Sequence, residues 1–265
     1  MTRFSLDPSH LADWSLSAVL NFSLILLAGL LVGVGSAPRA NAQEARVGLR
    51  AGPTFGFLSD SAVPFSGGTR TTNANPRIDL HVGAYVVVPL TDHFALQPEL
   101  LFLQKGGHFS QPLSERYAVE RYRLAYLQGA FLLRRNLVVP GPLSVHLVAG
   151  LTVDRALGGV VQRNAQFRGL DFGDRIPLLE TGRLQRWGVG GLVGGGVGYP
   201  LGTAGRVSLD VRYNPGFRTV FSNGDRSGTD SISEPGTVFP LPPPGLRHDV
   251  ITASLSFTLP LAALF

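Results

Sequence analysis

Nine polar or charged side chains are the residues of this sequence whose types and spacing could do chemistry. They are Arg50, Asp79, His81, Gln97, Glu99, His146, Asp154, Asp210 and Arg212. Each stands opposite apolar residues in a segment that alternates with a period of two, and such alternation places them on one face of a sheet. We expect this polar face to be enclosed. Opposite charges should then pair, because an unpaired buried charge is costly, and the cluster has a structural role.

Three of the histidines are candidates for metal ligands or general bases: His81, His146 and His248. No two histidines have the spacing of a metal motif, and no helical pattern carries them. The glycine-rich run at 188–196, GVGGLVGGG, looks like a dinucleotide fingerprint, but neither a helix nor an acidic residue follows at the required distance. We therefore predict no metal site and no cofactor.

A lipid hydrolase would need a serine beside a histidine and a carboxylate, because the nucleophile must lose its proton to a neighbour. His248 with Asp249, or Ser110 after His108, could be imagined in that role. Nothing in their spacing selects them. We predict that the protein is not an enzyme and has no catalytic residue.

The elements that carry the polar face are clearest between residues 78 and 107. Ile78, Leu80 and Val82 share one face there, opposite Asp79 and His81. A second alternating run follows after a connection with room only for a tight turn. Two antiparallel strands joined by a hairpin are therefore predicted.

The same alternation recurs along the chain and predicts eight strands. They lie at about 46–56, 77–88, 93–104, 119–133, 143–156, 184–199, 207–214 and 247–259. Connections alternate between short turns and long polar loops, and the long loops are at 57–76, 105–118, 157–183 and 220–246. This sorting of loops by length is typical of outer-membrane barrels, whereas a soluble sandwich has no reason for it.

The register of the strand at 119–133 is open between two alternatives. The first puts Ala125, Leu127, Gly129, Phe131 and Leu133 outward, together with Arg121 and Arg123 near the loop end, where long side chains can reach an interface. The second puts Tyr122, Leu124, Tyr126, Gln128 and Ala130 outward.

Residues 1–42 have the features of a cleavable signal peptide. An apolar core at 24–34 is followed by small residues and by Ala40-Asn41-Ala42, the signature that signal peptidase recognises. The domains expected are this leader and a barrel at 43–265. An uncleaved membrane helix at 16–35 is the alternative, since that stretch could just span a bilayer.

Composition excludes several classes of function. The absence of cysteine rules out disulfides, thiolate metal sites and cysteine catalysis. A formal net charge of +5 would suit nucleic acid, but the arginines are scattered over loops and strand ends without a helix or an aromatic platform. We therefore expect no nucleic-acid partner. The 44% hydrophobic content is dispersed in short alternating runs, as lipid-facing strands require.

Together these patterns predict an all-β fold: an eight-stranded antiparallel up-and-down transmembrane β-barrel, with its apolar face toward lipid and its polar face enclosed. Eight strands leave an interior just filled by side chains, so the default is a barrel without an open pore. A secreted soluble β-sandwich remains the structural alternative.

The sequence also resembles the PorT-like outer-membrane β-barrel family. The resemblance is carried by VGLRAGPTFGFLSD, by HVGAYVVVPLTDHFALQPELLFLQKGG, by YLQGAFLLRRN and by the final alternating strand, and it is most specific over 94–107. Where family members read leucine-glutamate-isoleucine-proline, this chain has Leu127-Gln128-Gly129-Ala130. Phe265, or Phe257, resembles the terminal aromatic that the barrel-assembly machinery recognises.

The resemblance implies an eight-stranded barrel in the outer membrane of a Gram-negative bacterium. The function we expect is a membrane-anchored scaffold whose long extracellular loops meet the surroundings or a partner in the envelope. Its partners would be outer-membrane lipid, the assembly machinery during insertion and an envelope protein. A narrow channel for small solutes is the first alternative and a lipid-modifying hydrolase is the second.

Overall fold

The structure, a computed structural model, describes residues 45–59, 73–113, 116–167, 170–179, 184–220 and 247–264. These residues belong to one compact unit, Glu44–Phe265. Its strands are β1 (Arg46–Ser59), β2 (Asn73–Pro89), β3 (Phe94–Leu113), β4 (Arg116–Leu137), β5 (Ser144–Phe167), β6 (Leu170–Pro177), β7 (Trp187–Pro200), β8 (Arg206–Thr219) and β9 (Arg247–Pro260). The expected leader at 1–42, Phe265 and most of the loops at 57–76 and 220–246 lie outside the described residues.

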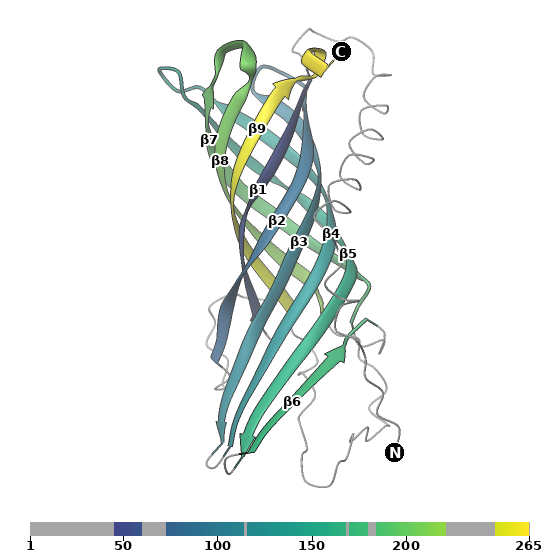
Figure 1. Cartoon of the computed structure of the whole chain (residues 1–265). Helices are drawn as coiled ribbons and strands as arrows, with labels where there is room; N and C mark the ends of the chain where they lie inside the picture. The colour runs from purple at the N-terminus through teal and green to yellow at the C-terminus, as the bar shows by residue number, and fades with distance from the viewer. Residues whose placement is uncertain are drawn as a thin grey trace. The chain divides into compact units, whose positions relative to one another are not determined.

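Eight of these strands close into one antiparallel ring (Figure 1). Each strand from β1 to β5 pairs with the next, β5 continues to β7, and the first strand, β1, pairs with the last, β9. Within the described part of the chain, β6 pairs with β5 alone. The predicted eight-stranded up-and-down barrel is confirmed, and two stacked sheets are not what the chain forms.

Three short connections lie at one end of the ring, called here the turn end. They join β2 to β3 at 90–93, β4 to β5 at 138–143 and β7 to β8 at 201–205. Gly141 and Gly205 have φ values of 92° and 116°, a conformation that glycine adopts at low cost. The backbone N–H of Leu261 donates to the carbonyl of Ala45 at this end, over 2.8 Å. Both ends of the barrel segment therefore meet at the turn end.

Two of the predicted long loops are wrong, because the structure continues the strands through them. The expected loop at 105–118 is paired strand up to Leu113↔Arg116, and the expected loop at 157–183 contains the β5–β6 hairpin as far as Pro177. Glycines and charges were read as loop signals there. A neighbouring strand that satisfies every backbone group overrides such weak local preferences. On the β3–β6 side, the barrel wall is therefore longer than elsewhere, and the additional length lies at the end opposite the short turns (Figure 1).

Alternation along each strand separates an apolar outer face from a filled interior. On β4, Phe131 is 77% exposed while its neighbours Ala130 and Leu132 are 1% exposed. This confirms the first of the two registers for that strand. Other strands carry Leu151, Leu209 and similar residues outward on the same principle, with more than half of each side chain exposed.

At the end of β3 and β4 that is far from the turns, the apolar residues change from the outer face to the inner face. There Leu103, Tyr122 and Leu124 are buried inside, while Arg121 and Arg123 are exposed on the outer face. The ring therefore has two zones. The zone next to the turns has an apolar exterior and a polar interior, and the zone beyond it has the reverse arrangement, like a water-soluble sheet.

Candidate functional site in the barrel interior

The structure places all nine predicted polar residues inside the barrel, each at most 8% exposed. The centre is an ion cluster of four of them: Arg50 on β1, Glu99 on β3, and Asp210 and Arg212 on β8. Arg212 Nη1 donates to both oxygens of Glu99, at 3.0 and 2.8 Å. Arg50 lies 3.5 Å from Glu99 and 3.9 Å from Asp210. Two cations and two anions thus compensate one another away from water.

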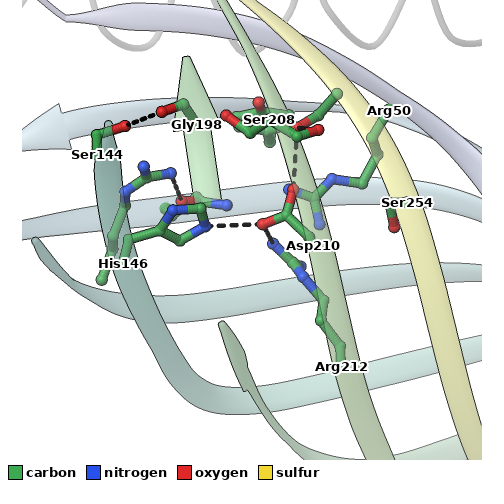
Figure 2. Close-up of polar contacts among 12 residues, drawn as sticks. Arg50, Ser144, His146, Gly198, Ser208, Asp210, Arg212 and Ser254 are labelled. Atoms are coloured by element: carbon green, nitrogen blue, oxygen red, sulfur yellow. Dashed lines mark hydrogen bonds and ion pairs between the residues drawn. The ribbon is translucent and has the colours of Figure 1, made fainter. Parts of the chain in front are cut away.

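Asp210 joins this ion cluster to side chains on β5 and β9 (Figure 2). Besides Arg50, it contacts the imidazole Nε2 of His146 at 2.7 Å and accepts a hydrogen bond from the Ser256 hydroxyl at 2.9 Å. Glycine on β7 makes this packing possible. A Cβ on Gly196 would lie 2.6 Å from the Asp210 carboxylate and 2.7 Å from the His146 ring. The glycine-rich sequence of β7 therefore serves as space for the side chains of its neighbours.

Arg134 extends the cluster toward the turn end and was missed by the sequence analysis. Its guanidinium donates to Gln97 at 3.0 Å and to Asn136 at 3.0 Å, and Gln97 in turn donates to Glu99 at 2.6 Å. The sequence Arg134-Arg135-Asn136 looked like a polar connection, but β4 runs to Leu137 and turns Arg134 inward. Continuation of the alternation of β4 by a few residues was the signal that could have found it.

A second polar cluster lies further from the turns, and its cation was also missed. Lys105 Nζ contacts Asp154 at 2.6 Å, and Gln128 donates to the other oxygen of Asp154 at 2.7 Å. Asn214 accepts a hydrogen bond from Gln128 at 3.3 Å and donates to Thr152 at 3.1 Å. The sequence predicts that Lys105 lies in a loop at 105–118, whereas β3 continues to Leu113.

The remaining predicted residues, His81 and Asp79, have local partners. His81 lies between the hydroxyls of Thr54 and Ser254, at 3.1 and 2.8 Å. The Asp79 carboxylate accepts hydrogen bonds from Arg77 Nε at 2.7 and 2.9 Å. Both side chains are buried and have their partners within the barrel wall.

An apolar cluster packs inside the barrel around and beyond the second polar cluster. It is called here the apolar cap and consists of Leu101, Leu103, Tyr122, Leu124, Tyr126, Ala156, Val161, Leu178, Leu184 and Val220. Leu178 and Leu184 follow β6, and the backbone of Leu184 hydrogen-bonds to that of Leu178. The segment after β6 thus contributes side chains that fill the interior.

Between the ion cluster and the apolar cap lies a small cavity. Its lining includes Arg50, Glu99 and Arg212 on one side and Leu101 and Leu103 on the other. The centres of water molecules have about 20 Å³ available, enough for one or two waters. The interior can hold internal water, but this cavity is too small for a solute larger than that.

Among the described residues, no serine, histidine and carboxylate form a hydrogen-bonded triad. His81 contacts the Ser254 hydroxyl, but its other ring nitrogen contacts the Thr54 hydroxyl and no carboxylate. His146 contacts Asp210, but its other ring nitrogen has no hydrogen-bond partner and so activates no serine. His248 packs against the Tyr126 ring inside, whereas Asp249 accepts a hydrogen bond from Tyr213, so the two adjacent residues face different partners. The side chains of His108 and Ser110 lie outside those described.

Among the residues that the structure describes, no group of three or more metal-ligating side chains lies together. No helix in the same part of the chain is long and apolar enough to span a membrane.

Comparison with known proteins gives one family and several solved folds. A family model described as "Outer membrane protein beta-barrel domain" matches residues 41–222, more than half of the chain. No curated protein sequence matches. Similar solved structures include the Neisserial surface protein NspA (11% identity, TM-score 0.38, 80% of this chain and 96% of that one) and OprG of Pseudomonas aeruginosa (13%, 0.37, 82% and 96%). Ail of Yersinia pestis is also similar (8%, 0.33, 82% and 100%).

Proposed function

Because the chain belongs to the outer membrane protein β-barrel domain family, we propose that it is a non-enzymatic barrel anchored in the outer membrane of a Gram-negative bacterium. The barrel would act as a scaffold. It would present its extended β3–β6 side and its long loops to the surroundings or to an envelope partner. The PorT-like resemblance is compatible with this proposal and names the narrower family we expect. The leader at 1–42 would be cleaved after Ala42.

The observation that carries the proposal is the exposed apolar face, bounded at both ends by an arginine over an aromatic ring. At the turn end Arg135 lies over Phe94, 5.9 Å from the ring centre, and at the other end Arg155 lies over Trp187, at 5.6 Å. Aromatic residues flank the lipid-facing band of membrane barrels, since their rings suit the interface. The two pairs would mark the two membrane surfaces.

The distance between these pairs fits a membrane. Arg155 pairs with Leu127 on β4, which is eight residues from Arg135. At about 3.3 Å per residue this is roughly 26 Å along the strand, and a tilt of about 40° reduces it to roughly 20 Å across the membrane. An outer-membrane barrel has an apolar band of about 25 Å.

Trp187 provides the test. The sequence has two tryptophans, and the other one, Trp14, would be removed with the leader, so Trp187 would be the single tryptophan of a chain that starts at Gln43. In bilayers of brominated phosphatidylcholine, we expect bromines near the headgroup to quench Trp187 fluorescence more than deep bromines do. A matched variant, Phe131→Trp with Trp187→Phe, moves the probe to the middle of the band and should reverse that order. Absence of quenching in both proteins, at every bromine depth, would rule out the membrane placement.

A narrow channel is supported less well. The cavity has room for no more than one or two waters, and ion pairs and the apolar cap fill the interior on either side of it. Within the part of the chain that the structure describes, no assembled triad supports the hydrolase alternative. For assembly, we propose that Phe257, outward on β9 and 39% exposed, offers the aromatic that the assembly machinery would recognise.

A further inference from the structure

The barrel interior carries more positive than negative charge around the ion cluster. Arg50, Arg134 and Arg212 are buried there and supply three cations, whereas Glu99 and Asp210 supply two anions. Arg134 donates hydrogen bonds to two neutral amides and, in the described part of the chain, forms no ion pair with a carboxylate. The ion cluster together with Arg134 therefore has an excess of one positive charge.

The neighbouring charges inside the barrel do not offset this excess. Lys105 pairs with Asp154, and Arg77 pairs with Asp79, so each of these cations already has its own anion. The buried histidines bring no negative charge, whether or not they are protonated. Because a buried net charge costs free energy, the described interior would be stabilised by one additional anion.

Two arginines of the ion cluster also have unused hydrogen-bond donors. Among the described residues, Nε and Nη1 of Arg50 and Nε and Nη2 of Arg212 have no hydrogen-bond partner. Nη1 of Arg50 lies 3.5 Å from Glu99 and Nη2 of Arg212 lies 3.8 Å from Asp210, so both attract a carboxylate without donating to it. A buried N–H group without an acceptor is costly, so a further acceptor would satisfy these donors.

Both arginines line the small cavity between the ion cluster and the apolar cap. Leu101 and Leu103 line its other side, and such a wall of low polarity strengthens the attraction between an anion and a guanidinium group. Glu99 lines the cavity as well. Both of its carboxylate oxygens accept hydrogen bonds from Arg212, which offsets the repulsion between Glu99 and a second anion.

The size of the cavity restricts the class of anion. It leaves about 20 Å³ for the centres of water-sized particles, which is enough for one monatomic ion and too little for phosphate, sulfate or an organic acid. Water could accept hydrogen bonds in the same place, but it would leave the positive charge unbalanced. A halide supplies both the acceptor and the missing charge.

We propose that this cavity binds one chloride ion, held by the guanidinium groups of Arg50 and Arg212. The chloride completes the charge balance of the interior and joins β1 to β8 through a shared ligand. The inference goes beyond the scaffold function and does not depend on the placement of the barrel in a membrane.

The first test measures the stability of the refolded protein in zwitterionic detergent micelles. Urea unfolding is followed in sodium chloride and in sodium methanesulfonate, whose anion is too large for the cavity, at one constant ionic strength. Above the dissociation constant, each tenfold rise in chloride should raise the free energy of unfolding by about 1.4 kcal/mol, because chloride binds only the folded barrel. Equal stability in the two salts at every concentration would overturn the inference.

Two adjacent arginines give a matched pair of variants. Arg134→Gln removes the excess charge without changing the lining of the cavity, and it should weaken chloride binding at least about tenfold. Arg135→Gln removes the same charge from the outer face and should leave the chloride dependence unchanged. Glu99→Gln combined with Arg212→Gln keeps the charge excess but removes donors from the cavity, so it should also abolish the dependence. A full chloride dependence in this double variant would place the ion elsewhere and overturn the inference.

The second test uses the natural chain, so it holds even if a variant does not fold. In crystals grown in sodium bromide, anomalous scattering should show one bromide in the cavity, in contact with the guanidinium groups of Arg50 and Arg212. Water alone in the cavity would overturn the inference. Bromide in the crystal without a chloride-dependent stability in solution would indicate an adventitious ion only, and would overturn it as well.

Discussion

The imidazole Nε2 of His146 lies 2.7 Å from the Asp210 carboxylate inside the barrel, and a glycine on a neighbouring strand leaves the space that both side chains occupy. Gly196 on β7 lies against both: its added Cβ would be 2.7 Å or less from each, and also 2.7 Å from the Leu209 carbonyl. The backbone contact cannot be relieved by rotating a side chain. The ion cluster therefore depends on the glycine content of a neighbouring strand.

Gly196→Ala is expected to destabilise the folded barrel by about 1 to 3 kcal/mol, because an added methyl must displace either the ion cluster or the backbone. The free energy of unfolding in guanidinium chloride measures this. Gly129→Ala is the matched control, since a Cβ on Gly129, on the outer face of β4, would have its nearest contact at 4.0 Å. Equal stability of the two variants would contradict the packing role of Gly196.

Lys105→Met is expected to cost about 3 to 5 kcal/mol, because it leaves the buried Asp154 carboxylate without its cation. Adding Asp154→Asn should recover part of this loss, since the remaining amide can still accept the hydrogen bond from Gln128. A double-mutant cycle on the free energy of unfolding gives the coupling energy of the pair. Strictly additive losses would show that the 2.6 Å contact contributes nothing.

The sequence was sufficient for the ring and, except for the strand at 119–133, for the side of each strand that faces inward. Asp79 and His81, or Asp210 and Arg212, could be assigned to the interior because alternation alone separates two faces. Which residues pair could not be predicted. Arg212 and Glu99 are 113 residues apart, and their contact depends on ring closure and on the register of every strand between them.

The sequence analysis failed where the pattern inverts. The polar, glycine-containing run that begins at Lys105-Gly106-Gly107 favours a loop, so the sequence alone does not predict that β3 continues. Beyond the band, Leu103 and Leu124 turn inward and Arg123 turns outward, as in a strand facing water. A reading that allows the apolar face of a strand to change from outward to inward along its length would have recovered β6 and the full length of β3 to β5.

Single cysteines test the two faces, since the natural chain has no cysteine. In the reconstituted protein, Leu209→Cys should react with a lipid-soluble maleimide and resist a membrane-impermeant one, because Leu209 is 60% exposed on the outer face that we propose lies in lipid. Ser208→Cys, buried at 4%, should react slowly with both. Val138→Cys, in a short turn, is the positive control for the impermeant reagent. Fast reaction of Leu209→Cys with that reagent would indicate a water-exposed outer face.

Planar-bilayer recordings separate the scaffold from the channel. We expect the refolded barrel to give no stable conductance steps, because ion pairs such as Arg212 with Glu99 fill the interior and the apolar cap closes its far end. Removing one charge in Arg212→Gln or Asp210→Asn should not open it, since the side chain that remains still occupies the space. Stable steps in the natural protein that disappear in either variant would instead assign conduction to this cluster and favour a channel for small solutes.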